Sequence, residues 1–223
     1  MVDNQYMFIH GLGLSGSIWS QMKPLFQDSK IVTPDLPGHG KGSRSSNKYD
    51  YGFPAMWSYL NEIVFDASFS ETILVLHSMS AGILPEIASS KNKPKAIVLV
   101  EGNLIGSDAR WSRQIQALKD NEYRNWLKRL QKNGSTILKS QLLNGHSQKK
   151  IDYWSDGFRE VDPLALRTIA ANIADRTSSG EIVSSLFVLD VPIIFLRGLE
   201  SGPWDEGTRL LKKLDIPLVI IPS

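Results

Sequence analysis

The chain contains no cysteine, which excludes disulfide bonds and thiolate metal sites. It also lacks an excess of one charge, because 25 basic residues face 23 acidic ones and the net charge is +2. This balance gives no reason to expect nucleic acid or an anionic membrane as a partner. No secretory signal is visible at the start, and no apolar run approaches the ~18 residues of a membrane-spanning helix. We therefore expect a cytoplasmic protein.

Short apolar runs recur along the chain, each about as long as a buried strand. They are residues 5–10, 30–35, 72–77, 95–100, 192–197 and 217–222. These runs are continuous rather than alternating, which is typical of parallel strands covered on both faces. Helical patterns follow three of them, at residues 16–27, 52–65 and 79–89. The alternation predicts an α/β fold with a mostly parallel, doubly wound sheet.

One interval, residues 101–191, is too long for a single crossover helix. It carries helical patterns at 117–134, 148–161 and 163–176, with breaks at Asn133-Gly134 and Asp162-Pro163. We predict a core formed by residues 1–102 and 188–223, with a helical cap inserted at 103–187.

The stretch FIHGLGLSG, Phe8 to Gly16, has the spacing G-x-G-x-x-G of a dinucleotide-binding loop. Two neighbours oppose that interpretation. Trp19 is bulky close to the phosphate position, and His10 stands where such strands normally end in a small or apolar residue. A lone glycine pattern is weak, so a dinucleotide-binding enzyme is kept as an alternative.

A second stretch, LVLHSMSAG, brings a buried strand directly into Ser78, where a helical pattern begins. A nucleophile elbow needs this arrangement, because a strained turn exposes the serine hydroxyl above the sheet edge. The competing interpretation is an ordinary serine at a helix start.

Together, these motifs resemble the α/β-hydrolase family. His10-Gly11 resembles its oxyanion loop, DLPGHGKGS (35–43) its Pro-Gly-His-Gly loop, and LHSMSAG its elbow. The resemblance implies a serine hydrolase that cleaves a small ester, thioester or related carbonyl compound through an acyl-enzyme. Ser78 would be the nucleophile, the Leu12 and Met79 N–H groups would form the oxyanion hole, and no metal or organic cofactor is implied.

The elbow departs from the family pattern at two positions. Leu76 stands where a small residue is usual, and Ser80 replaces the second glycine. Two glutamates are candidates for the catalytic acid. Glu101 follows one strand in VEGNL, as in the haloalkane dehalogenases, and Glu200 follows the next in LESG, the commoner place. We favour Glu101 slightly, and a surface carboxylate is the plain alternative for either.

A catalytic histidine is missing from its usual place after the last strand. Of the four histidines, His10 and His39 belong to loops, His77 precedes the serine and is expected to point elsewhere, and His146 lies in the cap. We therefore expect a Gly-His pair and a closing helix beyond Ser223. Without them, the chain would be a catalytically impaired hydrolase-like protein that binds a small molecule.

The cap carries aromatic residues that would line a substrate pocket or simply pack its helices together. They are Trp111, Trp126, Tyr153, Trp154 and Phe158. We predict that Trp111 and Trp154, with His10 and Gly11 of the oxyanion loop, contact the substrate. Related chemistries such as carbon–carbon bond hydrolysis stay open, because one fold hosts many activities. The sequence does not predict an oligomeric state.

Overall fold

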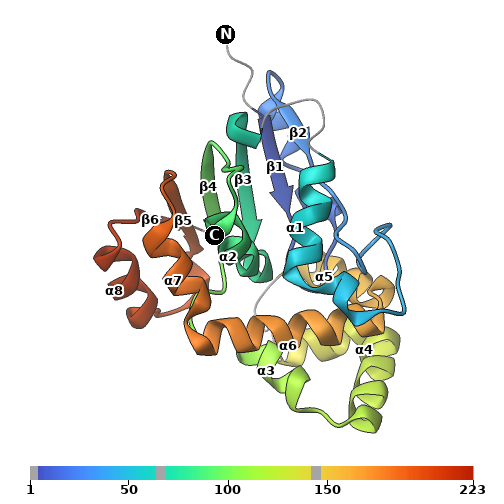
Figure 1. Ribbon diagram of the computed structural model, residues 1–223. Coiled ribbons are helices and arrows are strands. Elements are labelled where there is room, and N and C mark those ends of the chain that lie inside the picture. Colours follow the sequence, from blue (N-terminus) through green and yellow to red (C-terminus); the bar gives the residue numbers. More distant parts are fainter. Residues whose placement is uncertain (1–4, 64–68, 142–146, 223) are drawn as a thin grey trace.

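The computed structural model describes residues 5–63, 69–141 and 147–222 and centres on a six-stranded sheet (Figure 1). The strands are β1 (Gln5–Ile9), β2 (Lys30–Val32), β3 (Thr72–His77), β4 (Ala96–Val100), β5 (Ile193–Gly198) and β6 (Leu218–Ile221). All neighbouring strands are parallel, in the order β2-β1-β3-β4-β5-β6. Each strand overlaps a predicted apolar run, so the predicted α/β fold with a parallel sheet is confirmed.

The central strands are apolar on both sides because both faces of the sheet are covered. In β1, Met7 and Ile9 are fully buried in the main core. Phe8 packs against Trp19 and Phe26, with ring centroids 5.2 and 5.5 Å away. A continuous apolar run in the sequence therefore corresponds to a strand whose side chains are packed on both faces of the sheet.

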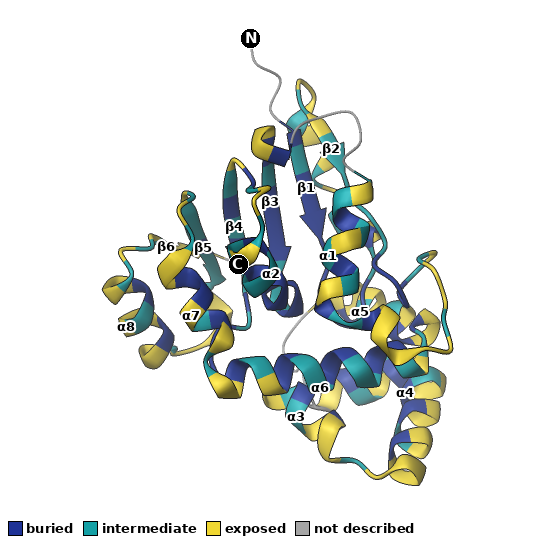
Figure 2. Ribbon diagram, in the orientation of Figure 1, coloured by how far each residue is buried: buried dark blue, intermediate teal, exposed yellow. Residues whose placement is uncertain are grey.

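Helices α1 (Phe53–Glu62), α2 (Leu84–Ser89) and α7 (Glu181–Val188) lie on one face of the sheet, and α8 (Asp205–Lys213) connects β5 to β6 (Figure 1). Burial follows this layering, because the central strands β1 and β3 are mostly dark whereas the strands toward the edges are paler (Figure 2). The 3₁₀ segments are η1 (Gly16–Trp19), η2 (Lys23–Phe26), η3 (Lys48–Tyr51), η4 (Phe69–Glu71), η5 (Ser78–Ile83) and η6 (Leu199–Ser201). Over the described ranges, no helix is long and apolar enough to cross a membrane.

Between β4 and β5 lies the helical segment, made of α3 (Arg110–Ala117), α4 (Asp120–Gln141), α5 (Gln148–Glu160) and α6 (Pro163–Ser179). It sits beyond the carboxyl ends of the strands (Figure 1). The predicted breaks have distinct outcomes: α4 is kinked at Asn133, whereas the Asp162 carboxylate caps α6 by accepting from the Leu164 and Ala165 N–H groups. All but the last residue of helix α7 falls within the predicted 103–187 range, although α7 contacts α2. The cap boundaries stay a prediction.

The single helix predicted at residues 16–27 is wrong, because the structure has the two short turns η1 and η2 there. The Gly16 N–H donates to Asp35 Oδ1 at 2.7 Å. Pro24 has no N–H to continue a helical ladder. Leu25, an apolar residue within this range, is 73% exposed.

Arg176 joins the helical segment to the sheet layer. Its two Nη atoms donate to the Glu86 carboxylate at 2.6 and 2.7 Å, and Nη1 also donates to the Gly82 carbonyl at 2.5 Å. The guanidinium lies 4.9 Å from the centre of the Phe53 ring. Both charged side chains are largely buried, so the loss of either one would leave the other as an unpaired buried charge.

We predict that Arg176→Ala lowers the free energy of unfolding by about 3 kcal/mol, since it leaves the Glu86 carboxylate without its buried partner. Arg159→Ala is the matched control, because Arg159 pairs with Asp156 at the surface and should cost less than about 1 kcal/mol. Urea denaturation of the three proteins measures both values. Equal losses for the two variants would contradict this account of Arg176.

Candidate active site

Ser78 stands at the bend where β3 ends and η5 begins. Its φ is 55°, a left-handed value that is uncommon for a residue with a side chain and marks a strained turn. The Ser78 hydroxyl donates to Asn103 Oδ1 at 3.2 Å, and the Asn103 N–H donates to the Ser78 carbonyl at 3.1 Å. The backbone at Ser78 therefore has the tight bend that an elbow requires.

The glycine loop that follows β1 lies directly against this bend. A Cβ placed on Gly11 would lie 2.8 Å from His77 Nδ1 and 3.1 Å from Ser78 Cβ, so a side chain there would push the loop away. The Leu14 N–H donates to the Gly11 carbonyl at 3.2 Å, closing a turn in which Gly13 has a φ of 69°. Only glycine adopts that φ without strain.

His10 holds this loop from behind. Its Nε2 accepts from the Leu36 N–H at 3.0 Å, which places the ring proton on Nδ1, where it is donated to the Gly11 carbonyl at 2.9 Å. Burial lowers the pKa of His10 to about 4, so the ring is neutral at pH 7. The Ser80 hydroxyl donates to the His10 carbonyl at 2.5 Å, which explains why this elbow position holds serine instead of glycine.

Asp35 connects the glycine loop to residues 35–43. Its carboxylate accepts from the Gly16 N–H at 2.7 Å and from the Lys41 N–H at 2.8 Å. Gly16 begins a 3₁₀ turn of four residues, not the α-helix whose N-terminus would hold a pyrophosphate. The geometry of the G-x-G-x-x-G stretch thus fits a packed turn beside a serine.

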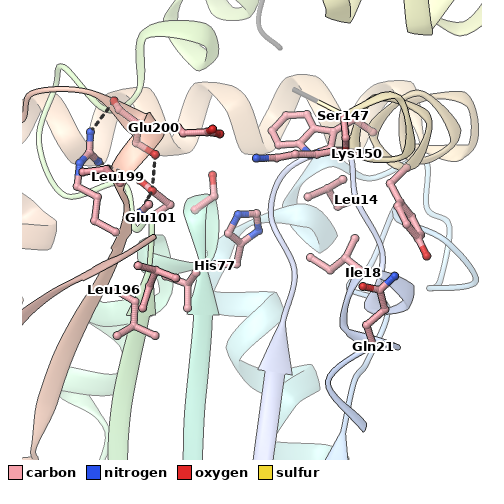
Figure 3. Close-up of a pocket in the computed structure, with 18 of the residues that line it drawn as sticks. Leu14, Ile18, Gln21, His77, Glu101, Ser147, Lys150, Leu196, Leu199 and Glu200 are labelled. Carbon is pink, nitrogen blue, oxygen red and sulfur yellow. Dashed lines mark hydrogen bonds and ion pairs between the residues drawn. The ribbon is translucent and has the colours of Figure 1, made fainter. Parts of the chain in front are cut away.

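A pocket of about 740 Å³ opens at the carboxyl ends of β3, β4 and β5 (Figure 3). Ser78, Glu101 and Glu200 line it from the sheet side, and Lys150 and Trp154 line it from α5. Its volume is within the range of small-molecule sites. The structure thus brings the predicted nucleophile and both candidate acids to one cavity.

Glu101 links the ends of two strands. It follows β4 with a φ of 50°, and its carboxylate accepts from Arg197 Nη1 at 2.9 Å, the Gly198 N–H at 2.7 Å and the Ser201 hydroxyl at 2.5 Å. Glu200 is exposed on η6 and points across the pocket toward Lys150 (Figure 3). The choice of acid stays a prediction.

Asn103 is a site residue that the sequence reasoning missed. Its Nδ2 donates to the Asp108 carbonyl at 2.7 Å, so its Oδ1 is the atom left to face Ser78. The Asp108 carboxylate fixes the same loop by accepting from the Leu104 N–H at 2.9 Å and from Trp204 Nε1 at 2.7 Å. Burial raises the pKa of Asp108. The available signal was a polar residue just past a buried strand, in VEGNL.

The profile described as the alpha/beta hydrolase family matches residues 7–206, a span that contains both the glycine loop and Ser78. The chain belongs to the alpha/beta hydrolase family. This confirms the resemblance expected from His10-Gly11, residues 35–43 and LHSMSAG.

Solved structures with the same fold carry different names. A bromoperoxidase from Bacillus anthracis superposes with a TM-score of 0.73 and 17% identity, covering 99% of this chain and 84% of that one. A hydrolase from Oleispira antarctica gives 0.71 and 17%, covering 100% and 83%. An esterase from Exiguobacterium antarcticum gives 0.69 and 13%, covering 98% and 82%. At these identities the likeness establishes the fold alone.

One curated relative, the magnesium-chelatase 30 kDa subunit of Rhodobacter capsulatus, is 29% identical over 92 residues. The match covers 41% of this chain and 32% of that relative's length. It therefore adds no activity to this alpha/beta hydrolase.

The histidines of this hydrolase are placed partly against expectation. His39 is buried, with its ring 4.9 Å from that of His10. The prediction that His77 points away from the site is wrong, since its ring lines the pocket. Strand alternation ends where Ser78 turns left-handed, so residues 77 and 78 both reach the cavity. His146 lies outside the described residues. Among the histidines that are described, none hydrogen-bonds to the Ser78 hydroxyl.

The predicted substrate contacts divide into two groups. Trp154 lines the pocket, whereas His10, Gly11 and Trp111 are not among the residues that line it. Trp111 instead packs against Phe158 and Trp126, with ring centroids 4.9 and 5.8 Å away. The Leu12 and Met79 side chains are buried and carry no hydrogen-bond donor, so their main-chain N–H groups are the predicted oxyanion donors. Within the described ranges, no cluster of three or more acidic or histidine side chains could hold a metal ion.

We predict that acidification destabilises the fold through His10. Its pKa is about 4 when folded, against an ordinary 6.5, so between these values only the unfolded chain binds the proton and stability falls as the pH falls. The loss in unfolding free energy between pH 7 and pH 4.5 should be about 1–3 kcal/mol smaller in His10→Gln than in the unaltered protein. Urea denaturation at both pH values measures it, and identical losses would refute the prediction.

Proposed function

We propose that this chain is a serine hydrolase that cleaves a small ester or thioester through an acyl-enzyme at Ser78. The left-handed backbone of Ser78, with Gly11 packed against it at a pocket, is the observation that carries the proposal. Such strain persists where the surrounding structure enforces it, and it clusters at functional sites.

In the proposed reaction, the Ser78 oxygen attacks the carbonyl carbon of the substrate. The Oγ–C bond forms, the bond to the leaving group breaks, and the serine proton goes to the leaving alcohol or thiol. Water then hydrolyses the acyl-enzyme and releases the acid. The Leu12 and Met79 N–H groups are the proposed oxyanion donors, and each such donor is typically worth about 10²–10³ in rate.

The acid of the proposed triad is Glu101 or Glu200. Glu101 already has three donors, from Arg197, Gly198 and Ser201, which suits a fixed carboxylate that orients an imidazole. Glu200 is exposed at the same pocket and lies in the family's commoner position. Among the described residues, no imidazole is hydrogen-bonded to the Ser78 hydroxyl.

A second function is favoured by one observation. The Ser78 hydroxyl bonds to Asn103, an amide that takes no proton, and to none of the described histidines. A hydrolase-like protein that binds a small molecule in this pocket without turning it over fits the same geometry.

A fluorophosphonate probe separates the two functions. We expect the unaltered protein to be labelled covalently and Ser78→Ala to lose the labelling, because only an activated serine reacts. Ser58→Ala, which removes an exposed serine of α1, is the control and should be labelled like the unaltered protein. Intact-protein mass spectrometry measures the adduct.

Absence of labelling in the unaltered protein would favour the binding function over the hydrolase. Equal labelling of Ser78→Ala would assign the nucleophile to a different residue.

A further inference from the structure

The wall of the pocket opposite the strand ends is formed by the first two turns of α5. Ser147, Lys150 and Trp154 line the cavity from this helix, at the three- and four-residue spacing of one helical face. Tyr153 and Lys149 line it as well. Figure 3 shows the Lys150 side chain extended into the pocket from this wall.

This wall is electrostatically positive for two separate reasons. Helix α5 has 13 residues and begins at the pocket with Ser147 as its cap, so its N-terminal N–H groups face that side. Lys149 and Lys150 stand in its first turn, which holds no acidic residue. Cations at a helix N-terminus oppose the helix dipole and cost stability. Their presence at the pocket concentrates positive potential there, which favours an anionic ligand.

The charge of Lys150 affects the pKa of His77, the residue before Ser78. Burial, together with the nearby His10 and Lys150, lowers the pKa of His77 to about 4, so the pocket holds a neutral imidazole there at pH 7. The His77 Nδ1 atom is buried and has no hydrogen-bond partner among the described residues. A ligand bound at Lys150 would thus lie in the pocket that His77 and Ser78 also line.

The charged residues on the opposite side of the pocket offset this potential only in part, because two lysines line one wall and Glu200 lies across from them. Arg197 and Glu101, which both line it, form an ion pair at 2.9 Å and neutralise each other. Glu200 points toward Lys150 from across the cavity (Figure 3). A ligand carboxylate would compete with Glu200 for the Lys150 ammonium. Leu14, Ile18 and Trp154 also line the pocket and supply apolar surface.

We propose that the pocket takes an acyl ester that carries a carboxylate at the far end of its acyl chain, with Lys150 binding that carboxylate while the ester carbonyl lies at Ser78. The apolar side chains of Leu14, Ile18 and Trp154 contact the hydrocarbon of the acyl chain. This inference rests on the proposed function, because it names the substrate class of the same site.

Binding of monomethyl adipate and dimethyl adipate to the Ser78→Ala protein tests the proposal by isothermal titration calorimetry. The two probes differ in one carboxylate, and Ser78→Ala prevents turnover. We expect monomethyl adipate to bind at least about tenfold more tightly, the equivalent of one charge-assisted hydrogen bond. Adding Lys150→Gln should remove this preference and leave the affinity for dimethyl adipate unchanged. Adding Lys150→Arg, which keeps the charge, should retain it.

Lys139→Gln is the matched control, because Lys139 is an exposed lysine of α4 outside the pocket lining, and it removes the same net charge. It should leave both affinities unchanged. Equal affinities for the two probes, no binding of monomethyl adipate, or an equal loss in the Lys139 and Lys150 variants would overturn the proposal. Because titration does not require chemistry, a fluorophosphonate failure with an intact carboxylate preference refutes only the hydrolase function. Successful fluorophosphonate labelling of Ser78 without a carboxylate preference refutes only the substrate class.

Discussion

At Ser78 the chain leaves a buried central strand with a left-handed φ of 55°, and the geometry of the site depends on that bend. It ends the strand alternation, so His77 and Ser78 both reach the pocket. It also brings the serine within reach of Asn103 on one side and Gly11 on the other. The surrounding sheet maintains this strained backbone, because β3 pairs with β1 on one side and with β4 on the other.

Hydrogen bonds between loops keep the rim of the sheet in place around this bend. Neutral, buried His10 joins the glycine loop to Leu36, and Asp35 joins it to Lys41. On the other side, Glu101 ties the end of β4 to Gly198 of β5. A site whose supporting loops are fixed before substrate arrives pays less reorganisation in the reaction. The same arrangement serves a binding pocket, which is why the hydroxyl at position 78 must be tested chemically.

Much of the fold was predictable because continuous apolar runs such as TILVLH specify strands buried on both faces. The bend was predictable for a related reason, since a buried strand ran directly into Ser78. The helix predicted at residues 16–27 was wrong because the apolar spacing there is helical. Pro24 and the hydrogen bond from Gly16 to Asp35 decide the local structure instead. The positions of Asn103 and Lys150 at the pocket depend on contacts between distant segments, and sequence periodicity does not report such contacts.

The most direct test of the account is a crystal structure of the protein after reaction with diethyl 4-nitrophenyl phosphate. The account predicts phosphorus bonded to the Ser78 oxygen. It also predicts a phosphoryl oxygen about 2.7–3.1 Å from both the Leu12 and Met79 nitrogens, the separation expected of an oxyanion hole. A phosphoryl group on another residue, or one on Ser78 whose oxygen is turned away from these two nitrogens, would contradict it.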